Sequence, residues 1–144
     1  SFDASDMRVA IVAAQFNPTI CDGLLERAVT ALETYHIARN TYEVYRVPGA
    51  IEIPAVVAAL AKRDTVDAVI AIGAIVRGET PHFDYVASFV TDGLRQITVH
   101  HALPVGFGIL TTDNHTQAEQ RYDVGSDAVI AALTSAQHIR SITQ

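Results

Sequence analysis

The sequence predicts a three-layer α/β/α sandwich whose central sheet has four parallel strands. Short runs rich in Val, Ile and Ala alternate four times with longer amphipathic segments, and short connections join them. This alternation is typical of a parallel sheet with helices on both faces. The runs contain few polar residues, as expected for strands that are covered on both sides. The 144 residues suffice for one core, and we expect a single domain over residues 1–144.

The first strand is predicted over Arg8–Ala14, because every residue of this run after the arginine is apolar. Pro18 then biases the residue before it away from helix. The next helix has an apolar stripe over residues 20–32, and Thr19 is predicted to cap it. Phe16 lies in the loop between these elements. Its ring fits two roles there, stacking on a planar ligand or filling the core.

The second strand is predicted over Thr41–Val47, where polar and apolar residues alternate as in a strand near a sheet edge. Pro48-Gly49 ends it. A helix follows over Pro54–Lys62, because proline is tolerated in a first helical turn. Glu52 stands between the strand and this helix. We expect it near the same sheet edge as Phe16, and a solvated surface carboxylate is the alternative.

The third strand is predicted over Val69–Val76, an apolar and β-branched run typical of a strand buried on both faces. The segment Arg77–Thr80 interrupts this run, and Gly78 lets the backbone turn. Thr80 is predicted to cap the next helix, with Pro81 at the first helical position, where its missing N–H is not needed. The sequence therefore predicts a strand, a tight turn and a helix in direct succession.

His82 stands in the first turn of that helix, ahead of an apolar stripe that runs from Tyr85 to Ile97. Such a helix begins above the carboxyl edge of the sheet, where open α/β sheets bind ligands. The unpaired N–H groups around Glu79–His82, Pro81 excepted, and the helix dipole favour an anion such as phosphate. We therefore predict that His82 transfers protons beside a bound anion. The alternative is an ordinary polar residue of a first turn.

The fourth strand is predicted over Pro104–Leu110, and its Phe107 lies between two glycines that indicate close approach of backbone or ligand. The Thr, Asp and Asn residues at 111–114 are predicted to cap a helix that runs through Arg121. A last helix is predicted over Ser126–His138. The guanidinium of Arg121 is a candidate partner for a phosphate group.

Together these elements predict a flavodoxin-like fold with a site in the loops after the four strands. That site is expected to combine Phe16, Glu52, residues 74–82 and Phe107. No G-x-G-x-x-G motif follows the first strand and no P-loop sequence occurs. The common dinucleotide and nucleoside triphosphate fingerprints are therefore absent.

The charge of the chain excludes some classes of partner. The formal net charge is −6 and the ten Lys and Arg residues are scattered, so no basic stripe is available for nucleic acid or an acidic membrane. Cys21 is the only cysteine, which excludes an intramolecular disulfide and a cysteine-based zinc site. His100-His101 has no third ligand at a recognisable spacing, so we expect no metal site.

The apolar pattern bears on location and assembly. No apolar run approaches the roughly 20 residues of a membrane span. The polar start of the chain is unlike a signal peptide, and we therefore expect a cytoplasmic protein. Apolar residues make up 49% of this short chain, which predicts that part of its surface is covered by self-association.

Four runs of the sequence resemble the 6,7-dimethyl-8-ribityllumazine synthase family. They are Phe16-Asn17, VPGAIEIP at 47–54, AIGAIVRGETPHFDYVA at 71–87 and GILTTDNHTQAEQR at 108–121. The resemblance covers roughly residues 8–132, in order and with the spacing of the family over most of that length. The third run is the most specific of the four.

The resemblance implies a transferase that catalyses the penultimate step of riboflavin biosynthesis. In this reaction 5-amino-6-(D-ribitylamino)uracil condenses with 3,4-dihydroxy-2-butanone 4-phosphate to give 6,7-dimethyl-8-ribityllumazine, phosphate and water. The resemblance implies small-molecule substrates, and the reaction requires no metal or cofactor. It also implies homopentamers, alone or in higher assemblies.

One set of positions matches those that hold the amine substrate in this family: Phe16, Ala50, Ile51, Glu52, Ala74, Ile75 and Val76. The resemblance implies that Phe16 stacks on the pyrimidine ring and that the three residues at 50–52 hold the ribityl chain. It also implies that the three residues at 74–76 contact the pyrimidine through backbone groups. The resemblance therefore implies that the heterocycle lies at the ends of the first and third strands.

A second set of positions matches those that handle the phosphate and the protons. Glu79 and Thr80 match residues that present N–H groups to the substrate phosphate, and His82 matches the residue that moves protons. Phe107 and Arg121 match residues that reach the site from a neighbouring subunit, with Arg121 directed toward the phosphate.

Two alternatives remain beside the synthase. One is a riboflavin synthase of the archaeal type, which is related and uses the same site location. The other is a non-catalytic homologue that binds lumazine or flavin or forms a shell. The run RGETPHFDYV favours the synthase. The non-catalytic alternative is supported by the absence of a lysine in the segment after Arg121, where many family members carry one.

Overall fold

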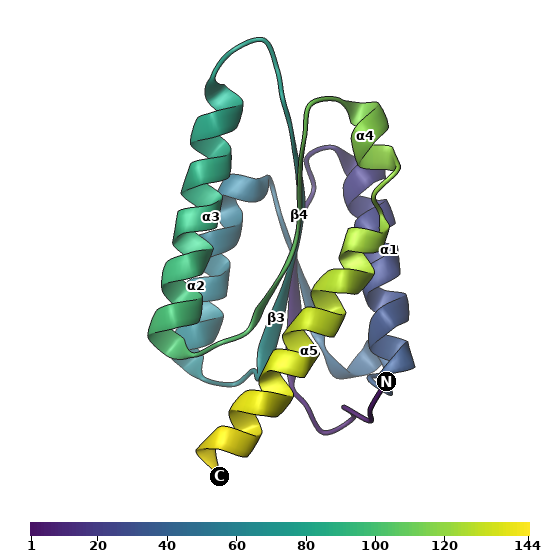
Figure 1. Ribbon diagram of the computed structural model, residues 1–144, viewed down its shortest axis with the longest axis vertical. Helices are drawn as coiled ribbons and strands as arrows, with labels where there is room; N and C mark the ends of the chain where they lie inside the picture. Colours follow the sequence, from purple (N-terminus) through teal and green to yellow (C-terminus); the bar gives the residue numbers. More distant parts are fainter.

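Four parallel strands form the sheet at the centre of the molecule (Figure 1). The computed structural model describes residues 1–144 and contains β1 (Val9–Ala14), β2 (Glu43–Val47), β3 (Ala68–Val76) and β4 (Val105–Thr112). Their order in the sheet is β2-β1-β3-β4, and every neighbouring pair is parallel. The predicted fold class is confirmed, and so is the edge position of the second strand.

The helices form one layer on each face of this sheet (Figure 1). On one face α1 (Pro18–Thr34) packs beside α5 (Asp123–Thr143), and on the other α2 (Ile53–Arg63) packs beside α3 (His82–His101). The short helix α4 (His115–Glu119) follows β4 on the side of α1. None of the helices combines the length and the apolar character that crossing a membrane requires. Two single 3-10 turns, Arg39–Thr41 and Ala50–Glu52, flank β2.

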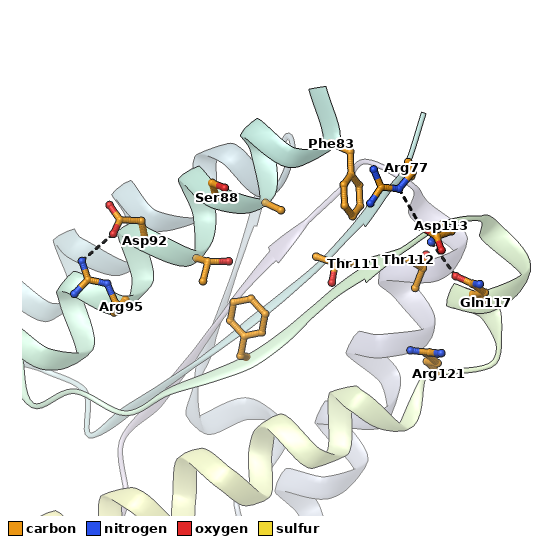
Figure 2. Close-up of a pocket in the computed structure, with 13 residues that line it drawn as sticks. Arg77, Phe83, Ser88, Asp92, Arg95, Thr111, Thr112, Asp113, Gln117 and Arg121 are labelled. Carbon is orange, nitrogen blue, oxygen red and sulfur yellow. Dashed lines mark hydrogen bonds and ion pairs between the residues drawn. The ribbon is translucent and has the colours of Figure 1, made fainter. Parts of the chain in front are cut away.

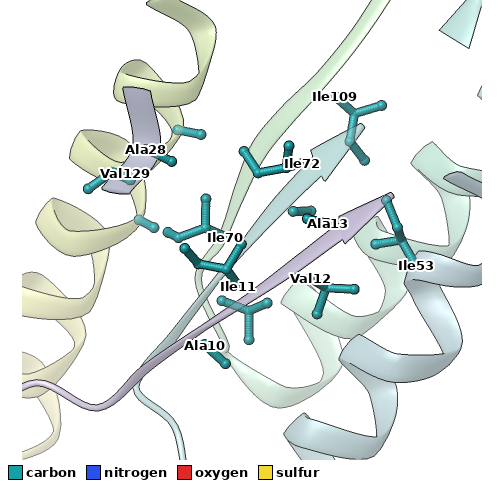
Figure 3. Packing of buried hydrophobic residues seen from close by; sticks show 14 of the residues in the cluster. Ala10, Ile11, Val12, Ala13, Ala28, Ile53, Ile70, Ile72, Ile109 and Val129 are labelled. Carbon is teal, nitrogen blue, oxygen red and sulfur yellow. The ribbon is translucent and has the colours of Figure 1, made fainter. Parts of the chain in front are cut away.

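Alternate residues of the central strands face opposite helical layers (Figure 3). Ile11 of β1 is the register partner of Ile70 of β3, and both lie toward the helices that carry Ala28 and Val129. The side chains at the alternate positions of β1 and β3 face the other way, toward Ile53 of α2. All five of these side chains belong to a single cluster of 42 buried residues. Each large aliphatic side chain buried in this way contributes about 1.5–3 kcal/mol to stability.

Two glycines allow α5 to approach its neighbours at backbone distance. A Cβ atom at Gly125 would overlap the carbonyl oxygen of Leu24 in α1, and one at Gly106 would overlap the carbonyl oxygen of Ala128 in α5. Neither carbonyl can rotate away as a flexible side chain could. Helix α5 is therefore fixed against both α1 and β4 by contacts that only glycine permits.

Several helix bounds differ from the predicted ones. Helix α4 ends at Glu119, so Arg121 lies outside it, and α5 begins at Asp123 rather than Ser126. Helix α1 begins at Pro18, and Asn17 precedes it in the left-handed conformation with φ 58° and ψ 60°. The prediction that Thr19 caps this helix is wrong, because proline already occupies the first helical position. Helix α3 begins at His82, one residue later than predicted. The Thr80 hydroxyl still accepts a hydrogen bond from the backbone N–H of His82 at 3.4 Å.

Charged side chains join three elements at the amino edge of the sheet. Asp67, just before β3, accepts hydrogen bonds from the backbone N–H of Arg8 at 2.8 Å and from its guanidinium at 3.1 and 3.3 Å. Arg140 of α5 lies 3.5 Å from the same carboxylate. Partial burial acts to raise the pKa of Asp67, but the hydrogen bonds from Arg8 and the positive charges outweigh it and lower the pKa.

We expect the Asp67→Asn substitution to destabilise the protein in a pH-dependent way. Because the pKa is lower in the folded state, the ionised carboxylate stabilises the fold above its unfolded pKa of about 3.9. This contribution is lost as the pH falls through the folded value. Urea unfolding should therefore show a deficit for the variant at neutral pH that narrows in acid. Asp6→Asn is the control, since Asp6 pairs with the same Arg140 but is more exposed. A deficit independent of pH would contradict the prediction.

We expect Gly125→Ala to lower the free energy of unfolding by about 1–3 kcal/mol, because the added methyl group forces two backbones apart. Gly78→Ala is the matched control, since a Cβ atom there meets nothing within 4 Å and no glycine has a positive φ. Denaturant midpoints of the two variants measure the difference. Equal midpoints would show that α5 can shift without loss.

Candidate active site

A cavity of about 710 Å³ opens where β1 and β3 end. These strands are neighbours in the sheet, yet the chain leaves β1 toward α1 on one face and leaves β3 toward α3 on the other. The loops therefore diverge and leave a crevice between them. This is the position at which open α/β sheets bind their ligands.

The backbone around Phe16 is held at several points. Its N–H donates to the carbonyl of Pro48 at 3.0 Å, and its own carbonyl accepts from the Cys21 thiol at 3.1 Å. The side-chain amide of Asn17 donates to the carbonyl of Ala74 at 3.3 Å, which ties the loop after β1 to the end of β3. The Phe16 ring remains 69% exposed and lines the cavity. This exposure excludes the core-filling alternative.

The thiol beneath this loop stays protonated. Cys21 is buried in the first turn of α1, and burial raises its pKa to about 11. The S–H group is therefore available as a donor to the carbonyl of Phe16 at neutral pH. The residue acts as a small buried support and not as a nucleophile.

The second wall of the cavity comes from the 3-10 turn after β2. Ala50 is buried, Ile51 is half-buried and Glu52 is exposed, and all three line the cavity. The N–H of Glu52 donates to the carbonyl of Gly49 at 3.2 Å, which closes the turn. One carboxylate thus lies beside two apolar side chains at the same opening.

The end of β3 and the loop after it form the floor. Ala74, Ile75 and Val76 line the cavity. The N–H groups of residues 78–80 donate no intramolecular hydrogen bond, so they are free for a ligand. Thr80 and His82 complete this side, and the His82 side chain is exposed. An imidazole, free N–H groups and an aromatic ring therefore surround one space.

The similarity of the chain to known proteins identifies its family. Residues 6–140 match the family model described as 6,7-dimethyl-8-ribityllumazine synthase. The chain belongs to this family. A relative of that name from Nocardioides sp. is 44% identical over 97% of this chain and 89% of its own length. Relatives of the same name from Kineococcus radiotolerans and Corynebacterium glutamicum are each 46% identical, over 97% and 93% of this chain and 89% and 86% of their own lengths.

Not every position matched to the lumazine synthase family lies on this cavity. Glu79 is exposed but does not line it, and Phe107 and Arg121 line a second cavity of about 870 Å³. This second cavity lies between α3 and β4 (Figure 2). The expectation that Phe107 shares one crevice with Phe16 is wrong within a single chain. Phe107 is the third residue of β4, well before the carboxyl end of the strand.

The two cavities are neighbours with a common wall. Arg77, Phe83 and Asp113 line both of them. Phe107 is 43% exposed on its side of this wall, and the exposed Arg121 forms no ion pair. Within one chain, this wall therefore separates Phe107 and Arg121 from the His82 cavity. These are the two residues that match positions contributed by a neighbouring subunit.

Sequence reasoning expected the loop after β4 at the site but assigned none of its residues there. Asp113, Asn114 and His115 all line the His82 cavity. The predicted capping role holds for Asn114, whose side chain accepts from the N–H of Gln117 at 2.9 Å. Their position directly after a strand was the available signal, because the carboxyl ends of parallel strands share one edge. No group of three or more His, Cys, Asp or Glu side chains is arranged to hold a metal ion.

The left-handed backbone of Asn17 gives a prediction about the Phe16 loop. Asn17→Ala and Asn17→Gly both remove the hydrogen bond to Ala74, but only alanine is strained at φ 58°. We expect the alanine variant to be less stable than the glycine variant by roughly 1 kcal/mol. Thermal or urea unfolding of the pair measures this difference. Equal stability would indicate that the loop adopts another conformation.

Proposed function

We propose that the protein is a 6,7-dimethyl-8-ribityllumazine synthase. It condenses 5-amino-6-(D-ribitylamino)uracil with 3,4-dihydroxy-2-butanone 4-phosphate and releases phosphate and water. The observation that carries the proposal is the cavity at the ends of β1 and β3. There the exposed Phe16 ring, free backbone N–H groups and the imidazole of His82 surround one space. Membership of the synthase family supports the same reaction.

In this proposal the amine substrate binds between the ends of β1 and β3. The Phe16 ring offers a flat apolar surface to the pyrimidine, and the favourable geometry for two rings is offset stacking. Backbone groups of residues 74–76 pair with the polar edge of the heterocycle. The ribityl chain extends along residues 50–52, where the Glu52 carboxylate accepts hydrogen bonds from hydroxyl groups.

The butanone phosphate binds at the start of α3. The free N–H groups of residues 78–80 and the positive end of the helix dipole favour its charge. Glu79 takes part through its backbone N–H group, and the residue is exposed and absent from the lining of the cavity. Thr80 adds a hydroxyl group, and Arg121 of a neighbouring subunit supplies a compensating positive charge.

The chemistry requires positioning and proton transfer more than strong activation. The amine nitrogen attacks the ketone carbon to form a C–N bond, and loss of water from the adduct gives an imine. Removal of the proton on the neighbouring hydroxyl-bearing carbon then expels phosphate as the leaving group, and the resulting enol tautomerises to a ketone. The ribitylamino nitrogen attacks this ketone, and loss of a second water closes the ring. His82 accepts and returns the protons of these steps. Holding both substrates together supplies much of the acceleration.

We further propose that the site is completed by self-association into pentamers, alone or in larger assemblies. Phe107 and Arg121 lie outside the His82 cavity of their own chain, which supports a role toward the cavity of a neighbour. Exposed aromatic side chains of α3, Tyr85 and Phe89, add surface that another chain could cover.

We also propose a location in the cytoplasm, because a reducing compartment suits a chain with one free cysteine.

The direct test is to mix the purified protein with both substrates and follow lumazine formation by absorbance and fluorescence. Sustained formation above the spontaneous rate is expected. Binding of lumazine without turnover would overturn the proposal in favour of a non-catalytic homologue. Conversion of lumazine to riboflavin would overturn it in favour of a riboflavin synthase.

We expect His82→Ala to slow the reaction without abolishing it. General acid–base help from one side chain is worth about 10²–10⁴-fold, whereas substrate positioning is retained in the variant. Steady-state kcat measures the loss, with His138→Ala on the exposed face of α5 as a control that should leave kcat unchanged. Total loss of turnover in a folded variant would contradict this ranking of the two effects.

A further inference from the structure

Arg77 occupies the wall between the two cavities and contacts both elements that form it (Figure 2). Its Nε donates to a carboxylate oxygen of Asp113 at 3.0 Å, and a terminal nitrogen lies 3.7 Å from the carboxylate of Asp84. The guanidinium carbon also lies 4.4 Å from the centre of the Phe83 ring. One side chain therefore contacts the first turn of α3 and the loop after β4.

Both ends of this connection are anchored. The backbone N–H of Arg77 donates to the carbonyl of Thr112 at 2.9 Å, so the side chain starts from a fixed point between β3 and β4. The N–H of Asp113 donates to the side-chain carbonyl of Gln117 in α4 at 2.8 Å. The contacts of Arg77 with Asp113, and of Asp113 with Gln117, thus connect the end of β3 to α4. We call these contacts, together with those of Arg77 to the first turn of α3, the Arg77 network.

The segment that this network spans has little other support. The N–H groups of residues 78–80 make no intramolecular hydrogen bond, and a Cβ atom at Gly78 would meet no neighbour within 4 Å. His82 follows at the end of this segment, directly before Phe83 and Asp84. The position of the imidazole therefore depends on how firmly the first turn of α3 is held.

An arginine is suited to this task in a way that lysine is not. The planar guanidinium can lie over a ring with its face and donate to carboxylates with its edge at the same time. An ammonium group carries the same charge but cannot do both. The side chains of Arg77, Asp84 and Asp113 are 45%, 65% and 67% exposed, so these pairs contribute little to global stability. Their effect is local order.

We propose that Arg77 is a positioning residue that holds the first turn of α3 against the β4–α4 loop and thereby fixes the imidazole of His82 at the substrate. The proposal rests on the proposed synthase activity. A displacement of about 1 Å at a reacting group is enough to slow a reaction severely. Arg77→Lys keeps the positive charge but removes the planar guanidinium. It should therefore lower kcat, which depends on the position of His82, more than it changes KM.

The test is a double-mutant cycle between Arg77→Lys and His82→Ala, read as kcat and KM for lumazine formation. In the wild-type background we expect Arg77→Lys to lower kcat about tenfold, with KM changed by less than about threefold. In the His82→Ala background the same substitution should change kcat less than about twofold, since two residues that act as a unit are not additive. Asp84→Asn should give the same pattern with a smaller loss. This second variant keeps Arg77 and does not alter a residue that lines either cavity.

Arg39→Lys is the matched control. Arg39 also lies between two carboxylates, those of Glu33 at 3.1 Å and Glu26 at 3.7 Å, but just before β2 at the opposite edge of the sheet. It should leave kcat unchanged, and all variants should keep the wild-type urea midpoint. Absence of lumazine formation by the wild-type protein would overturn the proposed function. An active wild type in which Arg77→Lys has no effect, or lowers kcat equally in both backgrounds, would overturn the positioning role alone.

Discussion

The pairing of β1 with β3 is the constraint on which the rest of the molecule depends. Residues 9–13 of β1 lie in parallel register with residues 68–72 of β3, and both strands are buried on both faces. Because a parallel pair cannot be joined by a hairpin, the chain must return over the faces of the sheet between them. The two return paths after β1 and β3 lie on opposite faces. The crevice at the carboxyl edge is thus a consequence of the same pairing that builds the core.

Stability and function draw on different parts of this arrangement. The buried cluster, the glycine contacts of α5 and the Asp67 network all lie within the layers or at the amino edge. The carboxyl edge instead carries exposed groups: a phenylalanine ring, free N–H groups and an imidazole. These exposed side chains contribute little to the free energy of folding, and apolar burial in the core compensates for them. A site assembled in this way can change in sequence with little effect on the core.

Much of the fold and part of the site could be predicted from sequence, for identifiable reasons. β1 and β3 follow from unbroken apolar runs, and β2 follows from alternation that ends at Pro48-Gly49. Gly78 and Pro81 likewise mark the turn before α3, and all of these are local signals. Other features depend on contacts between distant residues. The left-handed Asn17 is tied to Ala74, and the shared wall of Arg77 and Asp113 joins segments 36 positions apart. Periodicity carries no record of such contacts. The separation of Phe107 from the His82 cavity likewise depends on how far along β4 it lies.

The buried thiol of Cys21 has a consequence for following the motions of this molecule. It is the only sulfhydryl group in the chain, and it lies under the loop that carries the Phe16 ring. A reagent can reach it only when the start of α1 lifts away from the sheet. The rate of its alkylation in the native protein therefore depends on how often, or for what fraction of time, that loop is open. Cys21 is therefore a built-in labelling probe for local opening of the surface on which a heterocycle would rest.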